Sequence, residues 1–264
     1  MPRSSYYKWL NRQIPQKEKQ DNELANLVIE YQRSFNGILG YRRMTMFINK
    51  LNHTNFSEKY IHRIMVAMKM QARIRRKKYN YIKSKPEQTG ENILNRDFTA
   101  TAPNQKWCTD VTEFKILNQK RKVYLSAIID LYDRSIIAYV LSNSNNNKLV
   151  FDTFDLAIKN NPEAKPIFHS DRGFQYTSKQ FKYKLDEAHM TQSMSRVGKC
   201  IDNGPMEGFW GTLKSEMYYG FKWTDEKILR DTIEEYIRFY NEDRFQYNLN
   251  GMTPNEFRNH AINV

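Results

Sequence analysis

Cysteine is almost absent from this sequence, which has only Cys108 and Cys200 among its 264 residues. The two lie far apart and neither belongs to a C-x-x-C pair. Zinc knuckles and disulfide frameworks need clustered cysteines, so the sequence argues against both. Glycine and proline number only 10 and 8, which argues against a fibrous repeat or a disordered chain. We expect a globular protein.

Long apolar runs are missing as well. No stretch approaches the ~18 consecutive apolar residues of a membrane-spanning helix. The opening Met-Pro-Arg-Ser also lacks the apolar core of a signal peptide. We therefore expect a cytoplasmic protein with no membrane partner.

Acidic residues are scarce only in the first part of the chain. Residues 1–100 hold 20 Lys and Arg against 8 Asp and Glu, whereas residues 101–264 hold 22 against 21. The net charge of +13 therefore lies almost entirely in the first part. This asymmetry is typical of a nucleic-acid-binding module joined to a nearly neutral body. A solvated basic surface is the alternative.

Three stretches near the start carry apolar residues at the helical positions i, i+3, i+4 and i+7. They begin at Leu24, Met44 and Ile61. A short polar turn separates the second stretch from the third, for which Ser57 is the expected N-cap. This pair predicts a helix-turn-helix, although other small helical bundles contain similar pairs.

Basic side chains accompany this predicted helix-turn-helix and continue beyond it. Contacts to phosphate dominate sequence-independent affinity for DNA, so these side chains predict double-stranded DNA as a partner. The candidate DNA-binding residues are Arg42, Arg43, Lys59, Arg63, Arg73, Arg75, Arg76, Lys77 and Lys78.

The rest of the chain predicts a mixed sheet with flanking helices. Three successive segments rich in β-branched and aromatic residues are followed by a helix, a strand and a helix. The predicted strands cover residues 107–116, 123–130, 135–141 and 166–169, and the helices cover 149–158 and 178–189. The expected organisation is a helical DNA-binding module over residues 1–82, a linker over 83–104, a core over 105–222 and a C-terminal helical extension over 223–264.

Three carboxylates in this second part are candidates for a functional site. Asp110 lies in an apolar strand, where an ionised carboxylate is costly unless it is paired or bound to a cation. Asp171 follows a strand, at the position where open α/β sheets place ligand-binding groups. Glu207 falls in the first turn of a predicted helix. Taken singly, the three are also compatible with a strand edge, a turn and a helix-dipole contact.

Taken together, the three carboxylates predict a site for two divalent metal ions. Mg²⁺ prefers a few carboxylate oxygens while it keeps water and phosphate ligands. Two ions about 4 Å apart activate the attacking oxygen and stabilise the leaving oxygen of a phosphodiester. We expect two Mg²⁺ ions, for which Mn²⁺ is able to substitute. No recognisable Ser-His-Asp, Cys-His or Gly-rich phosphate motif competes with this site.

The motifs around these residues resemble the Asp-Asp-Glu signature of transposases and retroviral integrases. Asp110 stands in WCTDVT, Asp171 in HSDRG and Glu207 in DNGPMEGFWGTLKSE, and 35 residues separate the last two carboxylates. Over nearly its whole length the chain is similar to the downstream-frame product of the insertion-sequence-three family. The further matching segments are SYYKWLNR at 5–12, GYRRM at 40–44 and YNEDRFQYNLNGMTP at 240–254.

The resemblance implies a ribonuclease-H-like catalytic core with Asp110, Asp171 and Glu207 as catalytic and metal-binding residues. It also implies cleavage and strand transfer at the ends of an insertion sequence, through recognition of inverted repeats and a circular intermediate. The family often has a basic residue seven places after the glutamate, where Lys214 stands. Nearly two helical turns place Lys214 on the face of Glu207, from which it could reach DNA phosphates.

The resemblance further implies a homo-oligomer that acts on transposon ends and target DNA in the bacterial cytoplasm, associated with the nucleoid. We also expect fusion to, or cooperation with, an upstream-frame product that supplies an oligomerising segment. The alternatives are a non-catalytic DNA-binding regulator of transposition and a ribonuclease-H-like nuclease without strand transfer. The sequence departs from the family pattern at Gly204-Pro205 and at Gln246, and it lacks the His-His-Cys-Cys zinc site of retroviral integrases.

Three further residues near the predicted strands need an interpretation. Asp130 and Asp133 are rivals for a metal site, and we interpret them as strand-end and turn residues because the three-carboxylate signature is already complete. We interpret His169 as a structural histidine, with a supporting role at the site or a DNA contact as the alternative.

Overall fold

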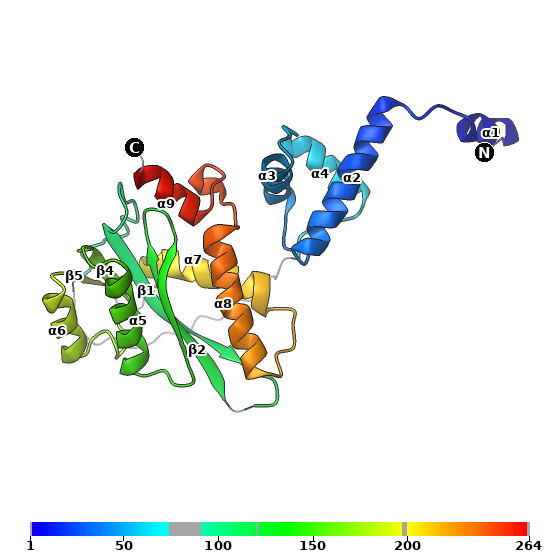
Figure 1. The fold of residues 1–264 in the computed structure, drawn as a ribbon. Helices are drawn as coiled ribbons and strands as arrows, with labels where there is room; N and C mark the ends of the chain where they lie inside the picture. The colour runs from blue at the N-terminus through cyan, green and yellow to red at the C-terminus, as the bar shows by residue number, and fades with distance from the viewer. Residues whose placement is uncertain (1, 74–90, 120, 197–199, 263–264) are drawn as a thin grey trace. The chain divides into compact units, whose positions relative to one another are not determined.

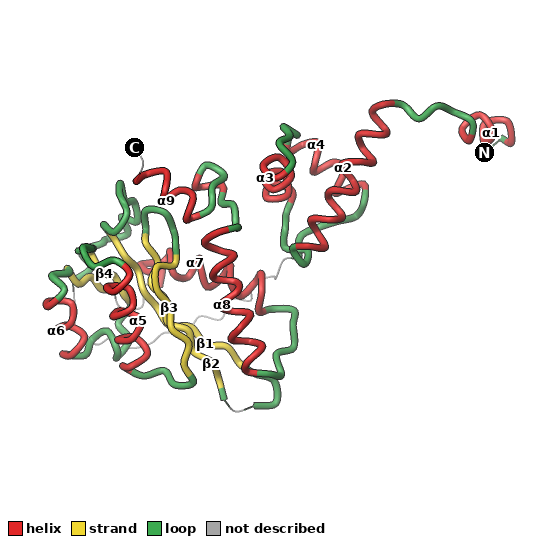
Figure 2. The backbone as a smooth tube through the Cα atoms, in the orientation of Figure 1, coloured by secondary structure: helices red, strands yellow, loops and turns green. Residues whose placement is uncertain are grey.

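The computed structural model describes residues 2–73, 91–119, 121–196 and 200–262 (Figures 1 and 2). The chain forms two compact units, which divide between residues 74 and 75. Within the described ranges, no helix combines the length and the apolar character that crossing a membrane requires.

The N-terminal unit is helical, as its apolar spacing predicts. Its helices are α1 (Arg3–Leu10), α2 (Gln16–Ser34), α3 (Tyr41–Leu51) and α4 (Glu58–Ala67). The last three pack together through buried residues of the predicted stripes, including Val28, Ile48 and Ile61. The predicted N-cap is confirmed, because the hydroxyl of Ser57 accepts the Tyr60 N–H at 3.2 Å. Helix α1 was not predicted as a helix.

The second unit contains a mixed five-stranded sheet in the order β3-β2-β1-β4-β5. Strand β1 pairs antiparallel with β2 and parallel with β4, β2 pairs antiparallel with β3, and β4 pairs parallel with β5. The strands are β1 (Lys106–Lys115), β2 (Lys122–Asp130), β3 (Ile136–Ser142), β4 (Ile167–Ser170) and β5 (Thr191–Met194). The first four follow the predicted strands closely. The sequence pattern does not predict β5, which has four residues and no β-branched apolar side chain.

Helices cover both faces of the sheet (Figure 1). On one face, α5 (Asn147–Asn160) and α6 (Lys179–Glu187) supply Phe154 and Phe181, which share a buried cluster with Trp107 of β1. On the other face, α7 (Gly204–Leu213) and α8 (Glu226–Glu242) supply Phe209 and other residues, which share a second cluster with Cys108 of β1. Neighbouring strand residues point to opposite faces, so β1 contributes to both clusters.

Short helices complete the second unit. A 3-10 helix η1 (Cys200–Asn203) precedes α7, and a π-helix η2 (Lys214–Tyr218) follows it. After α8 come the 3-10 helix η3 (Tyr247–Leu249) and the helix α9 (Pro254–Ile262). The aromatic residues Tyr236, Tyr240 and Phe245 are buried and pack within this unit.

Residues 91–104, the second part of the predicted linker, also carry a buried apolar side chain. Leu94 is 2% exposed and belongs to the cluster under α7 and α8, and Phe98 packs against that cluster.

Candidate active site

Asp110 stands in the middle of β1 on the face that α7 covers. Cys108 and Phe114 on this face belong to the cluster with α7, and alternation along the strand gives Asp110 the same orientation. Burial raises the pKa of Asp110, and together with the smaller effects of the negative charges of Asp171 and Glu207 it brings the pKa to about 7. Asp171 and Glu207 are therefore both within electrostatic range of Asp110.

Asp171 is placed next to Asp110 by the parallel pairing of β1 with β4. Cys108 pairs with His169, and Asp110 and Asp171 each come two residues after their member of this pair. Burial raises the pKa of Asp171, while a bond from the Gly173 N–H to Oδ1, 2.8 Å long, opposes the rise. A side chain at Gly173 would bring a Cβ to 3.0 Å from that oxygen. A side chain at this position would therefore force the Asp171 carboxylate to shift.

Glu207 is exposed and lies in the first turn of α7, as predicted. The neighbouring residues Met206 and Phe209 are buried, so the helix is fixed by one face while Glu207 remains accessible. Pro205 stands at the helix start, where its missing N–H costs no hydrogen bond. Asn203 is the N-cap residue of α7, but its side chain makes no capping bond to the helix. Instead, its Nδ2 donates to the Thr109 carbonyl at 3.0 Å. This bond ties the start of α7 to β1.

Asp202 anchors the segment that leads into α7, a role that the sequence analysis missed. Its carboxylate is fully buried and pairs with Arg96 at 2.6 Å and Arg196 at 2.8 Å. The Arg196 hydrogen bond is the main reason why the pKa of Asp202 lies well below its usual range. Asn92 Nδ2 is a third partner and donates at 3.0 Å. Its partners lie up to 110 residues away in sequence, so local motifs give no signal for them.

The chemistry of Asp110, Asp171 and Glu207 fits divalent cations. Two of the three are desolvated and their charges repel, and a cation offsets both costs. Across the described ranges, no group of three or more carboxylate, imidazole or thiolate side chains is gathered tightly enough to hold an ion. Mg²⁺ does not require such a group, because it commonly uses one or two carboxylates with water and substrate phosphates.

Known protein families match both units. The HTH-like domain family matches residues 19–78, and two Integrase core domain families match residues 100–200 and 207–262. The putative transposase InsK for insertion sequence element IS150 from Escherichia coli (strain K12) is 38% identical over 98% of this chain and 90% of its own length. The chain belongs to the insertion-sequence-three family of transposases.

A second relative of this transposase is InsF for insertion sequence IS3A from Escherichia coli (strain K12), 34% identical over 64% of the chain and 59% of its own length. Among solved structures, the HTLV-2 integrase catalytic core domain in complex with magnesium aligns over 60% of the chain and 98% of its own, with a TM-score of 0.45 and 19% identity. The predicted fold class, a ribonuclease-H-like mixed sheet after a helix-turn-helix module, is confirmed.

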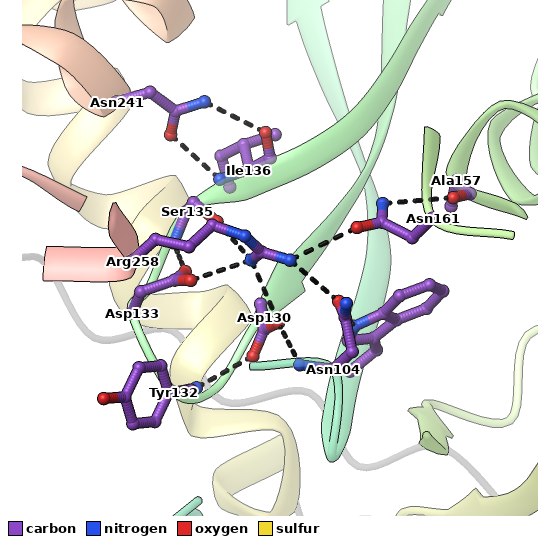
Figure 3. A network of polar contacts seen from close by, with 11 residues as sticks. Asn104, Asp130, Tyr132, Asp133, Ser135, Ile136, Ala157, Asn161, Asn241 and Arg258 are labelled. Carbon is purple, nitrogen blue, oxygen red and sulfur yellow. Dashed lines mark hydrogen bonds and ion pairs between the residues drawn. The ribbon is translucent and has the colours of Figure 1, made fainter. Parts of the chain in front are cut away.

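Asp130 and Asp133 of the transposase both form ion pairs with one arginine (Figure 3). Arg258 of α9 pairs with Asp133 at 2.7 Å and with Asp130 at 3.2 Å. Its other terminal nitrogen donates to Asn104 at 2.9 Å and to Asn161 at 3.2 Å. The interpretation of the two aspartates as structural rather than metal-binding agrees with these contacts.

His169 is fully buried beside two serines. Its Nδ1 lies 2.9 Å from the Ser193 hydroxyl and its Nε2 lies 3.1 Å from the Ser195 hydroxyl. Burial lowers the pKa of His169 to about 4, against a smaller opposing effect of Asp202. The ring is therefore neutral at pH 7, which agrees with a structural histidine.

The predicted DNA-binding residues of the N-terminal unit differ in what they contact. Arg63 pairs with Asp21 at 3.0 Å, Arg43 donates to the Ile38 carbonyl at 2.7 Å, and Arg42 lies 3.8 Å from the Glu58 carboxylate. On α4 Lys59 is exposed, and so is Arg73 beyond that helix. The remaining candidates, Arg75, Arg76, Lys77 and Lys78, lie outside the described residues.

Lys214, predicted to contact DNA beside the site, starts the π-helix that follows α7. Its ammonium group lies 5.3 Å from the centre of the Phe114 ring. A cation over an aromatic face is attracted to it, so the ring of β1 supports the lysine on the side of the sheet that also carries Asp110.

Proposed function

We propose that this transposase catalyses metal-dependent cleavage and strand transfer at the ends of an insertion sequence, with Asp110, Asp171 and Glu207 as ligands of two Mg²⁺ ions. The observation that carries the proposal is the placement of Asp110 beside Asp171 by paired parallel strands, with Glu207 of α7 near enough for its charge to act on Asp110. A site built to accumulate negative charge is suited to cations and thereby to a phosphodiester.

The positions of the three carboxylates support a different task for each of them. Asp110 lies on the central strand and Asp171 at the end of its parallel neighbour, so the sheet fixes these two relative to each other. Glu207 approaches from α7 and is exposed, so it stays accessible to solvent and substrate. Bound divalent ions would supply activation of the attacking oxygen and charge stabilisation at the leaving oxygen.

The reaction that these residues would support has two steps at phosphorus. In the first, a water oxygen bonds to phosphorus, the bond to the 3′ oxygen breaks, and a free 3′-hydroxyl remains at the element's end. In the second, that hydroxyl bonds to a target phosphorus and displaces its 3′ oxygen. We propose that double-stranded DNA is bound by an oligomer, through the basic residues of the helix-turn-helix unit and Lys214.

The substitution Glu207→Gln tests this proposal. It preserves volume and removes one anionic ligand, so cleavage and strand transfer should both be lost while binding to the transposon end stays unchanged. The measurement is conversion of labelled end duplexes in Mg²⁺ or Mn²⁺, with binding followed by fluorescence anisotropy.

Glu235→Gln, at an exposed glutamate of α8, is the matched control and should remain active. Strand transfer at the wild-type rate by Glu207→Gln would contradict the assignment. A wild-type protein that binds ends without cutting them would favour the non-catalytic regulator.

A further inference from the structure

Helix α7 is bonded to β1 on both sides of Glu207. At its start, Asn203 Nδ2 donates to the Thr109 carbonyl at 3.0 Å. Two turns later, the indole Nε1 of Trp210 donates to Asp110 Oδ2 at 3.0 Å. The two acceptors are consecutive residues of β1. Glu207 stands four residues after the first donor and three before the second, spacings that place all three on one side of a helix.

The indole bond acts on the carboxylate itself. Trp210 is 7% exposed and lies in the cluster between α7 and the sheet, so its N–H has little access to water. A buried indole N–H needs an acceptor, and an ionised carboxylate makes a stronger one than a neutral carbonyl. A carboxylate offers about four lone-pair sites. The indole bond, beside the interaction with the Val111 backbone N–H, orients Asp110 and still leaves oxygen lone pairs for cations.

The amide of Asn203 supports the same arrangement. Its Nδ2 makes the bond to β1, whereas its Oδ1 is buried with no hydrogen-bond partner in the part of the chain that the structure describes. The side chain thus contributes through its donor, which fixes the start of α7 against the strand that carries Asp110.

We propose that Trp210 is a positioning residue of the active site: its indole orients Asp110 for the divalent ions and, through α7, sets Glu207 against Asp110. This inference rests on the proposed function. The Asp-Asp-Glu signature includes only the three carboxylates, and Trp210 enters through its bond to the first of them and its helical position beside the third. Hydrogen bonds to ligating groups typically contribute about 10–100-fold to metal affinity or activity.

The substitution Trp210→Phe keeps an aromatic ring in the cluster and removes the N–H donor. Mn²⁺ binding to the full chain, followed by the electron paramagnetic resonance signal of free Mn²⁺, should weaken by about 10-fold. The Mn²⁺ concentration for half-maximal cleavage should rise by a similar factor. Thermal unfolding without metal should show that the variant is folded.

Trp223→Phe is the matched control. Trp223 packs against the same cluster. Its indole donates to the Tyr218 carbonyl at 2.9 Å and not to a carboxylate of the site. This variant should bind Mn²⁺ as the wild type does. A packing effect would change the unfolding temperature of both variants and the Mn²⁺ affinity of neither.

Two further variants separate the possible failures. Asp110→Asn should abolish Mn²⁺ binding at the site; if it binds as the wild type does, the proposed metal site itself is wrong. If Asp110→Asn loses binding while folded Trp210→Phe keeps it, only the positioning role is overturned. If Trp210→Phe does not fold, Asn203→Ala removes the other bond to β1 and should also raise the Mn²⁺ requirement. An unchanged requirement in that folded variant would overturn the part of the proposal in which the bonds between α7 and β1 set Glu207 against Asp110.

Discussion

Asp110 and His169 stand on adjacent parallel strands, and burial moves their pKa values in opposite directions. It raises the pKa of Asp110 to about 7 and lowers that of His169 to about 4. The cause is the same, because desolvation penalises the charged form of each side chain. Asp110 has two carboxylates, Asp171 and Glu207, as charged neighbours. The neutral His169 ring instead lies between two serine hydroxyls.

His169 should make the folded protein sensitive to acid. Its pKa is about 4 when folded and about 6.5 when unfolded, so the unfolded chain binds more protons between these values. The contribution of the neutral ring to stability is therefore present above pH 6.5 and is lost as the pH falls toward 4, by up to about 3 kcal/mol. We expect His169→Gln to flatten the pH dependence of the free energy of unfolding over this window, measured by urea denaturation.

The exposed His260 provides the control for this measurement. His260→Gln should leave the wild-type slope between pH 4 and 6.5 unchanged. Equal slopes for His169→Gln and the wild type would show that His169 does not titrate as its burial requires.

At the scale of elements, Arg258 of α9 makes polar contacts that join this helix to the sheet. Arg258 contacts the end of β2, the turn before β3 and the segment after α5 (Figure 3). Its side chain is 17% exposed, and the two aspartates that it pairs with are fully buried. Removing one partner of such a cluster leaves buried charges without compensation.

Arg258→Leu should destabilise the protein by about 3–5 kcal/mol at pH 7. Burial and the Asp133 charge already raise the pKa of Asp130 in the presence of the arginine. Without it, protonation offsets part of the loss, so the difference from the wild type should narrow as the pH falls. Urea denaturation at pH 7 and pH 5 measures both effects.

Arg230→Leu, which breaks an i,i+4 pair with Glu226 on α8, should cost less than about 1 kcal/mol. Equal losses for the two variants would contradict the role of the buried cluster.

At the scale of the whole molecule, charge and fold divide the chain in similar places. Residues 1–100 carry 20 basic against 8 acidic side chains, and the helical unit ends near residue 74. The boundaries of the DNA-binding module at residues 1–82 and of the core at 105–222 stay predictions. Both units match families of the expected kinds, an HTH-like domain and an Integrase core domain.

Removing residues 1–85 should lower DNA affinity and flatten its dependence on salt. Each lost phosphate contact reduces the slope of log K against log salt by about 0.9. Anisotropy titrations of an end duplex at several salt concentrations measure the slope, and circular dichroism checks that the remaining unit is folded. A folded truncated protein with the full-length affinity and slope would refute a DNA-binding role for the N-terminal unit.

Local periodicity predicted most elements but not the short or polar ones. Strands β1 to β4 are apolar enough to stand out, and the stripes of α2, α3 and α4 repeat at helical spacing. The polar strand β5 was missed because its pairing with β4 rather than its composition makes it a strand. The helix α1 leaves Tyr6, Tyr7 and Leu10 exposed, so its described side chains form no buried apolar stripe like those of the other helices.

The sequence by itself determined the carboxylates, their spacing, the basic module and the family, because these depend on residue identity and on local order along the chain. Only the tertiary structure decided what each charge contacts. Trp210 meets Asp110 across 100 positions and Arg258 meets Asp130 across 128. Such contacts arise when strand register and helix packing bring distant segments together. The same packing controls burial. Burial raises the pKa of Asp110, and it encloses Asp130 and Asp133 beside their ion-pair partner Arg258.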